Sequence, residues 1–225
     1  MYLSFEYISG ANTIPGGSLD GTANGTVSVV PGVSGNALYI KGDTDSKIYL
    51  GDRRDSCFWY PELCVNGYTI AYWLKIGSKV GDELYFISNG GQTGLSYGIA
   101  FMLKLQSSLL YLYKQHSVWW KMECVVTKET WLHVAFVWSN TTGGKAFLNG
   151  QKCDEDAIGE ANTRPNTIYN GYYFGKSNKR PTSEQHAGEA IFDELLFWPE
   201  DKSDGFISSL YDMYDTSKGM LYQHE

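Results

Sequence analysis

Short runs in which apolar and polar residues alternate occupy most of the chain, and this period of two is the pattern of half-buried β-strands. Aromatic residues gather in these runs, while Gly, Asn, Asp and Ser gather between them, as expected for strands joined by turns. The predicted strands are residues 2–7, 27–30, 35–40, 47–50, 68–76, 84–88, 97–105, 108–114, 118–127, 132–138, 145–153 and 188–198. Roughly a dozen strands of this kind predict an all-β fold, a two-sheet antiparallel jelly-roll sandwich.

One helix is expected near the end of the chain. Ser203 can cap its first turn, where the carboxylate of Asp204 is also favourable. The apolar positions that follow have the i, i+3, i+4, i+7 spacing of one buried helical face: Ile207, Leu210, Tyr211 and Tyr214.

The strand at residues 188–198 contains two adjacent carboxylates, Asp193 and Glu194, between apolar residues. Neighbouring residues of a strand point to opposite faces, so these two cannot share one solvated surface. An inward carboxylate needs a cation or several N–H donors. We expect the first and last strands to pair, with a cation shared between Glu6 and Asp193; the alternative is a hydrogen-bonded carboxylate beside an exposed neighbour.

Composition narrows the function classes. The 225 residues carry a net charge of −7, which gives no basic surface for nucleic acid. No apolar run approaches the ~20 residues of a membrane helix. The Gly- and Asn-rich passage at residues 9–35 is expected to cross a sheet edge or cap one end, and the chain has no linker or internal repeat. Residues 1–225 are therefore predicted to be one domain.

The four cysteines allow three pairings, and we prefer Cys57–Cys64, which clips a local loop, with Cys124–Cys153, which joins two strand regions. Their spacing does not fit a zinc site. Glycosylation sequons begin at Asn24 and Asn140. Paired cysteines and sequons together predict a secreted protein or the extracellular part of a membrane protein.

Six short sequence segments follow one another along the chain in the order seen in a known family: residues 5–6, 33–38, 68–75, 131–135, 148–150 and 192–195. They read Phe-Glu, Val-Ser-Gly-Asn-Ala-Leu, Tyr-Thr-Ile-Ala-Tyr-Trp-Leu-Lys, Trp-Leu-His-Val-Ala, Leu-Asn-Gly and Phe-Asp-Glu-Leu. With them the chain resembles the concanavalin A-like jelly rolls, specifically the laminin G-like and pentraxin-like domains of extracellular proteins. The resemblance covers residues 3–211.

This resemblance implies a structural calcium where the first and last strands meet. Glu6 and Asp193 match the ligand positions, and carbonyls near Gly42 and Asp43 are candidates for further ligands. Carboxylate and carbonyl oxygens are what Ca²⁺ prefers. Glu6 stands where such domains more usually have Asp.

Some members of the superfamily are glycoside hydrolases, which need two carboxylates at a fixed separation on one face. The nearest acidic cluster here, residues 154–156 with Glu160, is contiguous rather than alternating, and we interpret it as a solvated loop. No nucleophile elbow is present either. The chain is therefore not expected to be an enzyme.

The predicted function is a non-catalytic adhesion or recognition module that binds an extracellular protein or glycan through its rim loops. The candidate contact residues are Trp59, Asn89, Gln92, Lys176, Lys179 and Arg180. The three basic residues could meet a sulfated glycan. The loop of Trp59 could be a binding knob or a plug over one end of the core, and we prefer the plug. The alternative function is a lectin or glycan-active jelly-roll enzyme with an aromatic platform on the concave sheet. Sheet edges also offer a route to self-association.

Overall fold

Strand β17 (Ala190–Trp198) lies inside the first of two antiparallel sheets. The structure is a computed structural model and describes residues 2–3, 8, 13–14, 20–53, 55–91, 96–162, 171–177 and 186–214. One side of β17 pairs with β7 (Tyr68–Ile76), and the other pairs with β5 (Asn36–Ile40) and then β1 (Tyr2–Leu3). The predicted pairing of the first and last strands is confirmed for β1, because Leu3 lies opposite Leu195.

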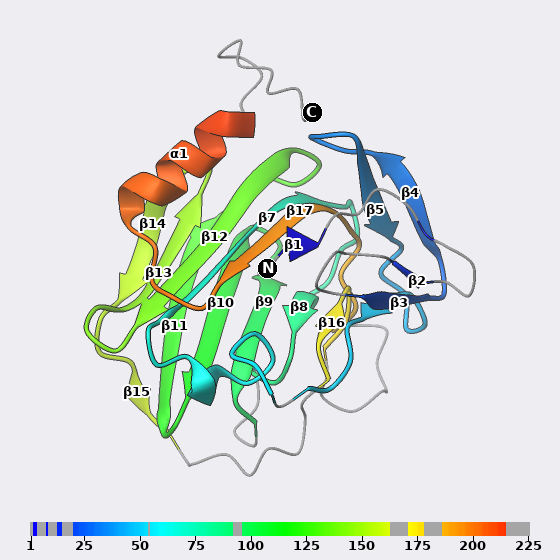
Figure 1. Cartoon of the computed structure of the whole chain (residues 1–225). Helices are drawn as coiled ribbons and strands as arrows, with labels where there is room; N and C mark the ends of the chain where they lie inside the picture. Colours follow the sequence, from blue (N-terminus) through cyan, green and yellow to red (C-terminus); the bar gives the residue numbers. More distant parts are fainter. Residues whose placement is uncertain are drawn as a thin grey trace.

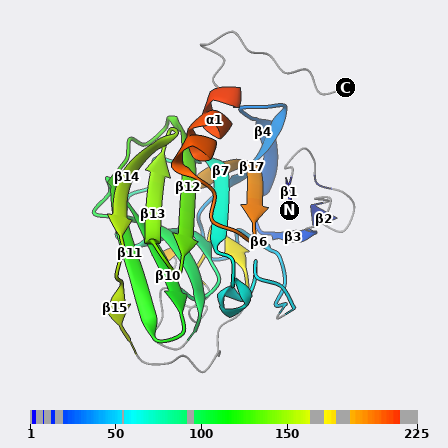
Figure 2. The ribbon, with the colours of Figure 1, turned by 60° about the vertical axis from the view of Figure 1, so that its left-hand side comes forward.

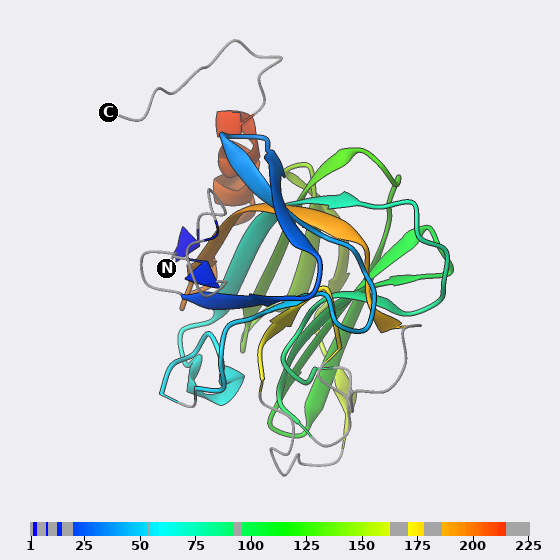
Figure 3. The same cartoon turned by 90° about the vertical axis from the view of Figure 1, so that its right-hand side faces the viewer.

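The first sheet, sheet A, has the order β14-β13-β12-β7-β17-β5-β4, with β1 beside β17. Its other strands are β4 (Val27–Pro31), β12 (Trp131–Ser139), β13 (Gly143–Leu148) and β14 (Gln151–Asp156). The β4–β5 hairpin, blue in Figure 3, lies beside the orange strand β17. The Asn149-Gly150 turn between β13 and β14 has positive φ at both residues, as the predicted hairpin requires.

The second sheet, sheet B, has the order β15-β11-β10-β9-β8-β16-β6-β3-β2. Its strands are β2 (Thr13–Ile14), β3 (Gly21–Asn24), β6 (Lys47–Tyr49), β8 (Leu84–Ser88), β9 (Gly98–Lys104), β10 (Ser108–Gln115), β11 (Val118–Val125), β15 (Glu160–Ala161) and β16 (Tyr173–Phe174). The turn from β3 to β4 leads from sheet B, where β3 lies next to the edge strand β2, to the edge of sheet A, so the described end of the glycine-rich passage runs from one sheet to the other. The two sheets face each other in Figure 1.

The core between the sheets is unusually aromatic. Side chains from alternate positions of both sheets meet there, and the largest fully buried ones include Trp138, Tyr68, Tyr72 and Tyr113. The rings of Tyr113 and Trp138 lie 5.0 Å apart between the sheets. Trp73, by contrast, points outward from sheet A and packs on the helix. The alternation therefore predicts the strands, but it does not decide on its own which face is inward.

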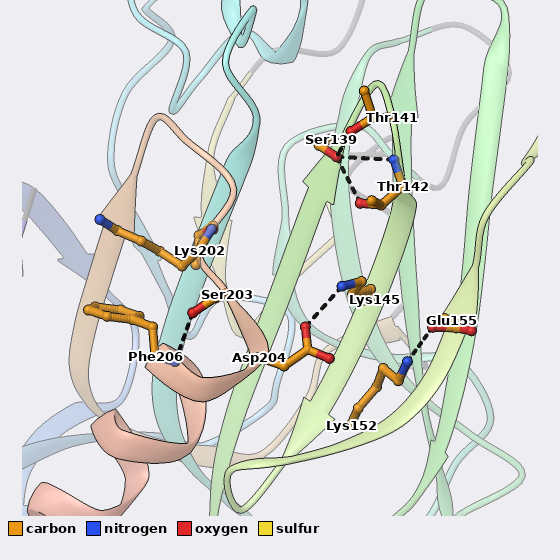
Figure 4. Close-up of polar contacts among 11 residues, drawn as sticks. Ser139, Thr141, Thr142, Lys145, Lys152, Glu155, Lys202, Ser203, Asp204 and Phe206 are labelled. Atoms are coloured by element: carbon orange, nitrogen blue, oxygen red, sulfur yellow. Dashed lines mark hydrogen bonds and ion pairs between the residues drawn. The ribbon is translucent and has the colours of Figure 1, made fainter.

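Helix α1 (Asp204–Tyr214) covers the outer face of sheet A, as Figures 1 and 2 show. Ile207 and Leu210 are buried against Ala71, Ala135, Val137 and Phe147 of β7, β12 and β13. The helix begins as predicted, since the Ser203 hydroxyl accepts a hydrogen bond from the Phe206 N–H at 3.2 Å. Asp204 pairs with Lys145 of β13 at 2.9 Å (Figure 4), which fixes the first turn on the sheet.

The acidic cluster at residues 154–156 is the main correction to the predicted elements. It is the end of strand β14 and not a solvated loop. The Asp154 carboxylate accepts a hydrogen bond from the Glu123 N–H at 2.8 Å, and Asp156 accepts one from the Lys121 N–H at 3.0 Å. These two carboxylates therefore bind the backbone edge of β11 and join sheet A to sheet B.

Both preferred disulfides are present. Cys57–Cys64 closes the loop that contains the 3₁₀ turn Pro61–Leu63, and Cys124–Cys153 connects β11 to β14. The second disulfide lies beside the carboxylate contacts just described, so covalent and polar links close the same side of the sandwich.

Candidate ligand-binding sites

Both carboxylates in the middle of β17 are buried, so the alternative in which one of them is an exposed neighbour is wrong. A bulge in the pairing of β17 with β7 falls between Asp193 and Leu196, and Glu194 has a φ of 48°. Glu194 accepts a hydrogen bond from the Tyr214 hydroxyl of α1 at 2.7 Å. The helix thus covers one carboxylate, while the turn between β4 and β5 covers the other.

The Asp193 carboxylate is held by this turn. Its Oδ2 accepts hydrogen bonds from the N–H groups of Val33 at 2.8 Å and Ser34 at 3.2 Å. A side chain at Gly32 would meet the same oxygen at 2.4 Å, so the approach requires glycine. The other oxygen, Oδ1, is buried and has no hydrogen-bond partner among the described residues.

Burial raises the pKa of Asp193 to about 7, because loss of hydration outweighs the stabilising N–H donors. A buried carboxylate oxygen without a partner is the arrangement that a cation would stabilise. Asp193 therefore fits the predicted cation site on its own geometry. Its predicted partner, Glu6, lies outside the described residues.

Gly42 and Asp43 do not fit as ligands of the same ion. The pairing of Ala190 with Ile40 puts Gly42 beyond one end of the β5–β17 ladder, whereas Asp193 lies beyond the other end. Five positions of strand separate the two, which corresponds to roughly 16 Å. This part of the prediction is wrong because the strands pair antiparallel and carry the two groups apart.

A lysine supplies the positive charge at the Gly42 end. The Lys79 ammonium donates hydrogen bonds to the carbonyls of Gly42 and, at 3.0 Å, Ala187. Asp43 is engaged locally, by the Ser46 N–H at 2.8 Å and by Lys41 at 3.3 Å. Within the described part of the chain, no cluster of three or more His, Cys, Asp or Glu side chains could hold a metal ion.

Two predicted contact residues on the rim are buried instead. Asn89 is 1% exposed and Trp59 is 4% exposed. The Asn89 side chain donates to the Trp59 carbonyl at 3.2 Å and accepts from the Ile99 N–H at 2.6 Å. Trp59 thus belongs to a plug over the end of the core, and Asn89 holds it there.

Of the remaining predicted contact residues, the structure describes only Lys176. Lys176 is half-buried, and burial together with the nearby charge of Lys47 lowers the pKa of its ammonium group. Gln92, Lys179 and Arg180 lie outside the described residues.

Both sequon asparagines are exposed: Asn24 is the last residue of β3, and Asn140 lies in the turn after β12. In the turn that contains Asn140, the Ser139 hydroxyl lies 2.8 Å from the Thr142 hydroxyl (Figure 4). Asn140 itself stays open to solvent.

The outer face of sheet B carries a groove that the sequence reasoning missed. Its volume is about 500 Å³, and it crosses β8, β9, β10 and β11. Its apolar lining consists of Tyr85, Met102, Leu110, Leu112, Trp119 and Met122. Tyr85, Met102 and Leu112 are nearly covered, whereas Leu110 and Trp119 are partly exposed.

Charged residues surround this apolar lining: Glu83, Lys104, Lys121, Glu123 and Asp154. The Lys121 ammonium lies 4.6 Å from the centre of the Trp119 ring and 2.7 Å from the Glu160 carboxylate. An apolar centre with a charged border is the composition of a binding surface.

The signal for this groove is present in β10. Leu109, Tyr111 and Tyr113 face the core, yet Leu110 and Leu112 at the alternate positions are also apolar. A strand with one solvated face would have polar residues there. The same two-sided pattern occurs in β7 and β12, whose outer face is covered by α1.

The family follows from a direct match. Residues 43–207 match a laminin G type family model described as the concanavalin A-like lectin/glucanases superfamily. The chain belongs to this superfamily. The two-sheet sandwich with its single short helix among the described residues agrees with this membership.

Individual relatives are more distant. The chain is 25% identical over 179 residues to the adhesion G-protein coupled receptor D1 of Bos taurus, a match that covers 77% of this chain and 18% of the receptor. The binding domain of Paraclostridial Mosquitocidal Protein 1 has a TM-score of 0.69 at 14% identity, over 95% of this chain and 52% of that one. The binding domain of botulinum neurotoxin DC, in complex with rat synaptotagmin II, has a TM-score of 0.67 at 12% identity, over 96% and 51%.

These structural likenesses show the fold alone, and the chain spans about half the length of each toxin binding domain. In the described part of the chain, no helix has the length and apolar character needed to cross a membrane.

Proposed function

We propose that this domain is a non-catalytic recognition module of an extracellular protein, and that it binds its partner, a protein or a glycan, through the outer face of sheet B. The groove across β8 to β11 carries this proposal, because it combines apolar side chains, an exposed position and a charged border. The laminin G-type family match and the similarity to an adhesion receptor support it.

One carboxylate of the groove, Asp154, is not free for acid–base chemistry. A hydrolase needs two carboxylates free to exchange protons with a substrate. Both oxygens of Asp154 accept backbone hydrogen bonds instead, from Glu123 at 2.8 Å and from Glu155 at 2.9 Å. This carboxylate is used in holding the two sheets together.

An extracellular position is supported by two disulfides, which persist in oxidising compartments. The exposed side chains of Asn24, at the end of β3, and Asn140, in a turn, are accessible to glycosylation. Mass spectrometry of the protein secreted from animal cells, before and after removal of N-glycans, tests both sites.

The structural calcium is proposed at Asp193 with Glu6, without Gly42 and Asp43. A bound Ca²⁺ would neutralise the buried carboxylate charge and give Oδ1 a partner. The test is thermal melting with calcium and with a chelator, on the wild type and on Asp193→Asn. A higher melting temperature in calcium that disappears in the variant supports the site, and equal melting of the wild type under both conditions rejects it.

The recognition function is tested with a labelled, tetramerised domain applied to cells that display a panel of membrane proteins, and to a glycan array. Leu110→Glu places a charge on the exposed part of the groove and is expected to abolish binding. Val65→Glu is the matched control, because Val65 is 75% exposed and does not line the groove. Binding that survives Leu110→Glu would move the contact surface elsewhere.

A further inference from the structure

We infer that the groove on sheet B takes an extended segment of a protein partner, in which an apolar residue lies between a basic and an acidic one. This inference rests on the proposed recognition function and names the chemistry of its partner.

The apolar lining is poorly suited to a sugar. Met102, Leu110 and Leu112 offer no hydrogen-bonding side chain to hydroxyl groups. The Trp119 indole N–H is buried and reaches no partner among the described residues. The Lys121 ammonium lies over the ring, which is the surface on which a sugar would stack. Tyr, Trp and Met are instead the side chains enriched at the centre of protein interfaces.

Two charges on the border of the groove are available to a partner. Lys121 is paired with Glu160, the Asp154 oxygens bind backbone N–H groups, and Glu83 lies 4.0 Å from His186. Lys104 and Glu123 are exposed, and neither forms an ion pair with another described residue. Lys104 is therefore a cation and Glu123 a carboxylate without an ion pair among the described residues, and Glu83 adds a second carboxylate, whose contact with His186 is an ion pair only when that imidazole is protonated.

The strand register sets the distance between these charges. Met102 of β9, Leu110 of β10 and Glu123 of β11 lie opposite one another, and Lys104 follows Met102 by two residues on the same face. Two strand spacings across and two residues along correspond to about 12 Å. The line between the charges crosses β10 between Ser108 and Leu110.

An extended peptide covers this distance in about four residues, and residues i, i+2 and i+4 of such a peptide point to the same side. The matching segment has a basic residue against Glu123, an acidic residue against Lys104 and an apolar residue two positions from each. Its apolar side chain would enter the groove beside Leu110.

The test is selection of a displayed library of random peptides on the purified domain, followed by titration of the selected peptides. The expected consensus has opposite charges four positions apart with an apolar residue between them. The double variant Lys104→Glu/Glu123→Lys should weaken the selected peptide at least tenfold and bind the peptide with exchanged charges. Leu110→Glu should bind neither peptide, and Val65→Glu should bind like the wild type. Melting temperatures of all variants establish that they are folded.

A consensus without the charge pair, or affinities unchanged by the double variant, would overturn the inference. Glycan binding that is lost in Leu110→Glu, without any peptide binding, would also overturn it and leave the recognition function standing. Absence of binding to peptides, glycans and displaying cells would reject the recognition function itself.

Discussion

The outer faces of the two sheets are both partly apolar, but they differ in what covers them. On sheet A, small and apolar residues of β7, β12 and β13 are buried beneath Ile207 and Leu210 of α1. On sheet B, the apolar residues of β9 and β10 line a groove, and the described residues place no helix over it. The same two-sided apolar pattern is thus packed against a helix in sheet A and lines an open groove in sheet B, and the eleven residues of α1 make the difference.

The largest effect is expected from opening the covered face. Ile207→Ala removes a side chain with no exposed surface and should lower the free energy of unfolding by about 4 kcal/mol, because it loses buried area and leaves a cavity. Chemical denaturation measures this loss. Met213→Ala on the same helix is the control, since Met213 is 50% exposed. A similar loss in both variants would mean that the helix is not docked through Ile207.

Acid should weaken the covered face as well. Burial between the rings of Trp73 and Tyr211 lowers the pKa of His133 to about 4. As the pH falls below about 6.5, the unfolded chain takes up this proton before the folded one, so the contribution of His133 is lost between about pH 6.5 and 4. The expected loss is roughly 3 kcal/mol.

The measurement is stability as a function of pH for the wild type and His133→Gln. Asp193 acts in the opposite direction, because its raised pKa keeps the proton on the folded state, so only the difference between the two proteins isolates His133. A difference that stays constant from pH 7 to 4 would contradict the assignment.

The groove should respond differently from the covered face. Leu110→Ala removes a partly exposed side chain, so it should cost at most about 1 kcal/mol of stability while it weakens partner binding. Denaturation and titration on the same preparation separate the two effects. A loss as large as that of Ile207→Ala would show that Leu110 is a core residue.

The smallest effect concerns the ion pair at the start of α1. Lys145→Met removes the partner of Asp204, and both side chains touch solvent, so the expected loss is about 0.5 kcal/mol and should shrink in high salt. Denaturation at low and high ionic strength measures it. A loss above that of Leu110→Ala would give this pair a larger part in docking the helix than its exposure indicates.

The sequence predicted strand positions well where the apolar pattern extended over five or more residues. β7 and β8 have the predicted bounds, and the helix begins at the predicted cap. The short strands β2, β3 and β15 were missed because two to four residues carry too little periodicity. The end of β14 was missed because three consecutive carboxylates are typical of a solvated loop, and only the neighbouring N–H groups of β11 explain them.

The sites were harder to predict than the strands. The sequence predicted one inward carboxylate in β17, because an acidic residue inside an apolar strand is costly without partners, and the structure buries both Asp193 and Glu194. The prediction that Gly42 and Asp43 bind the same ion as Asp193 was wrong. Strand register decides which loops meet, and register cannot be read from a single sequence. The groove was missed because apolar residues at both parities of β10 give no indication of which side remains open.

The carboxylates of Asp154 and Asp156 have a consequence for association between molecules. The backbone N–H groups of Lys121 and Glu123 are already bonded, so this stretch of β11 cannot offer them to a strand from another chain. Polymerisation by strand addition is blocked there, and the adjacent disulfide keeps β14 in place. At high concentration this edge of β11 therefore does not recruit a second copy, and the groove beside it stays uncovered by strand addition.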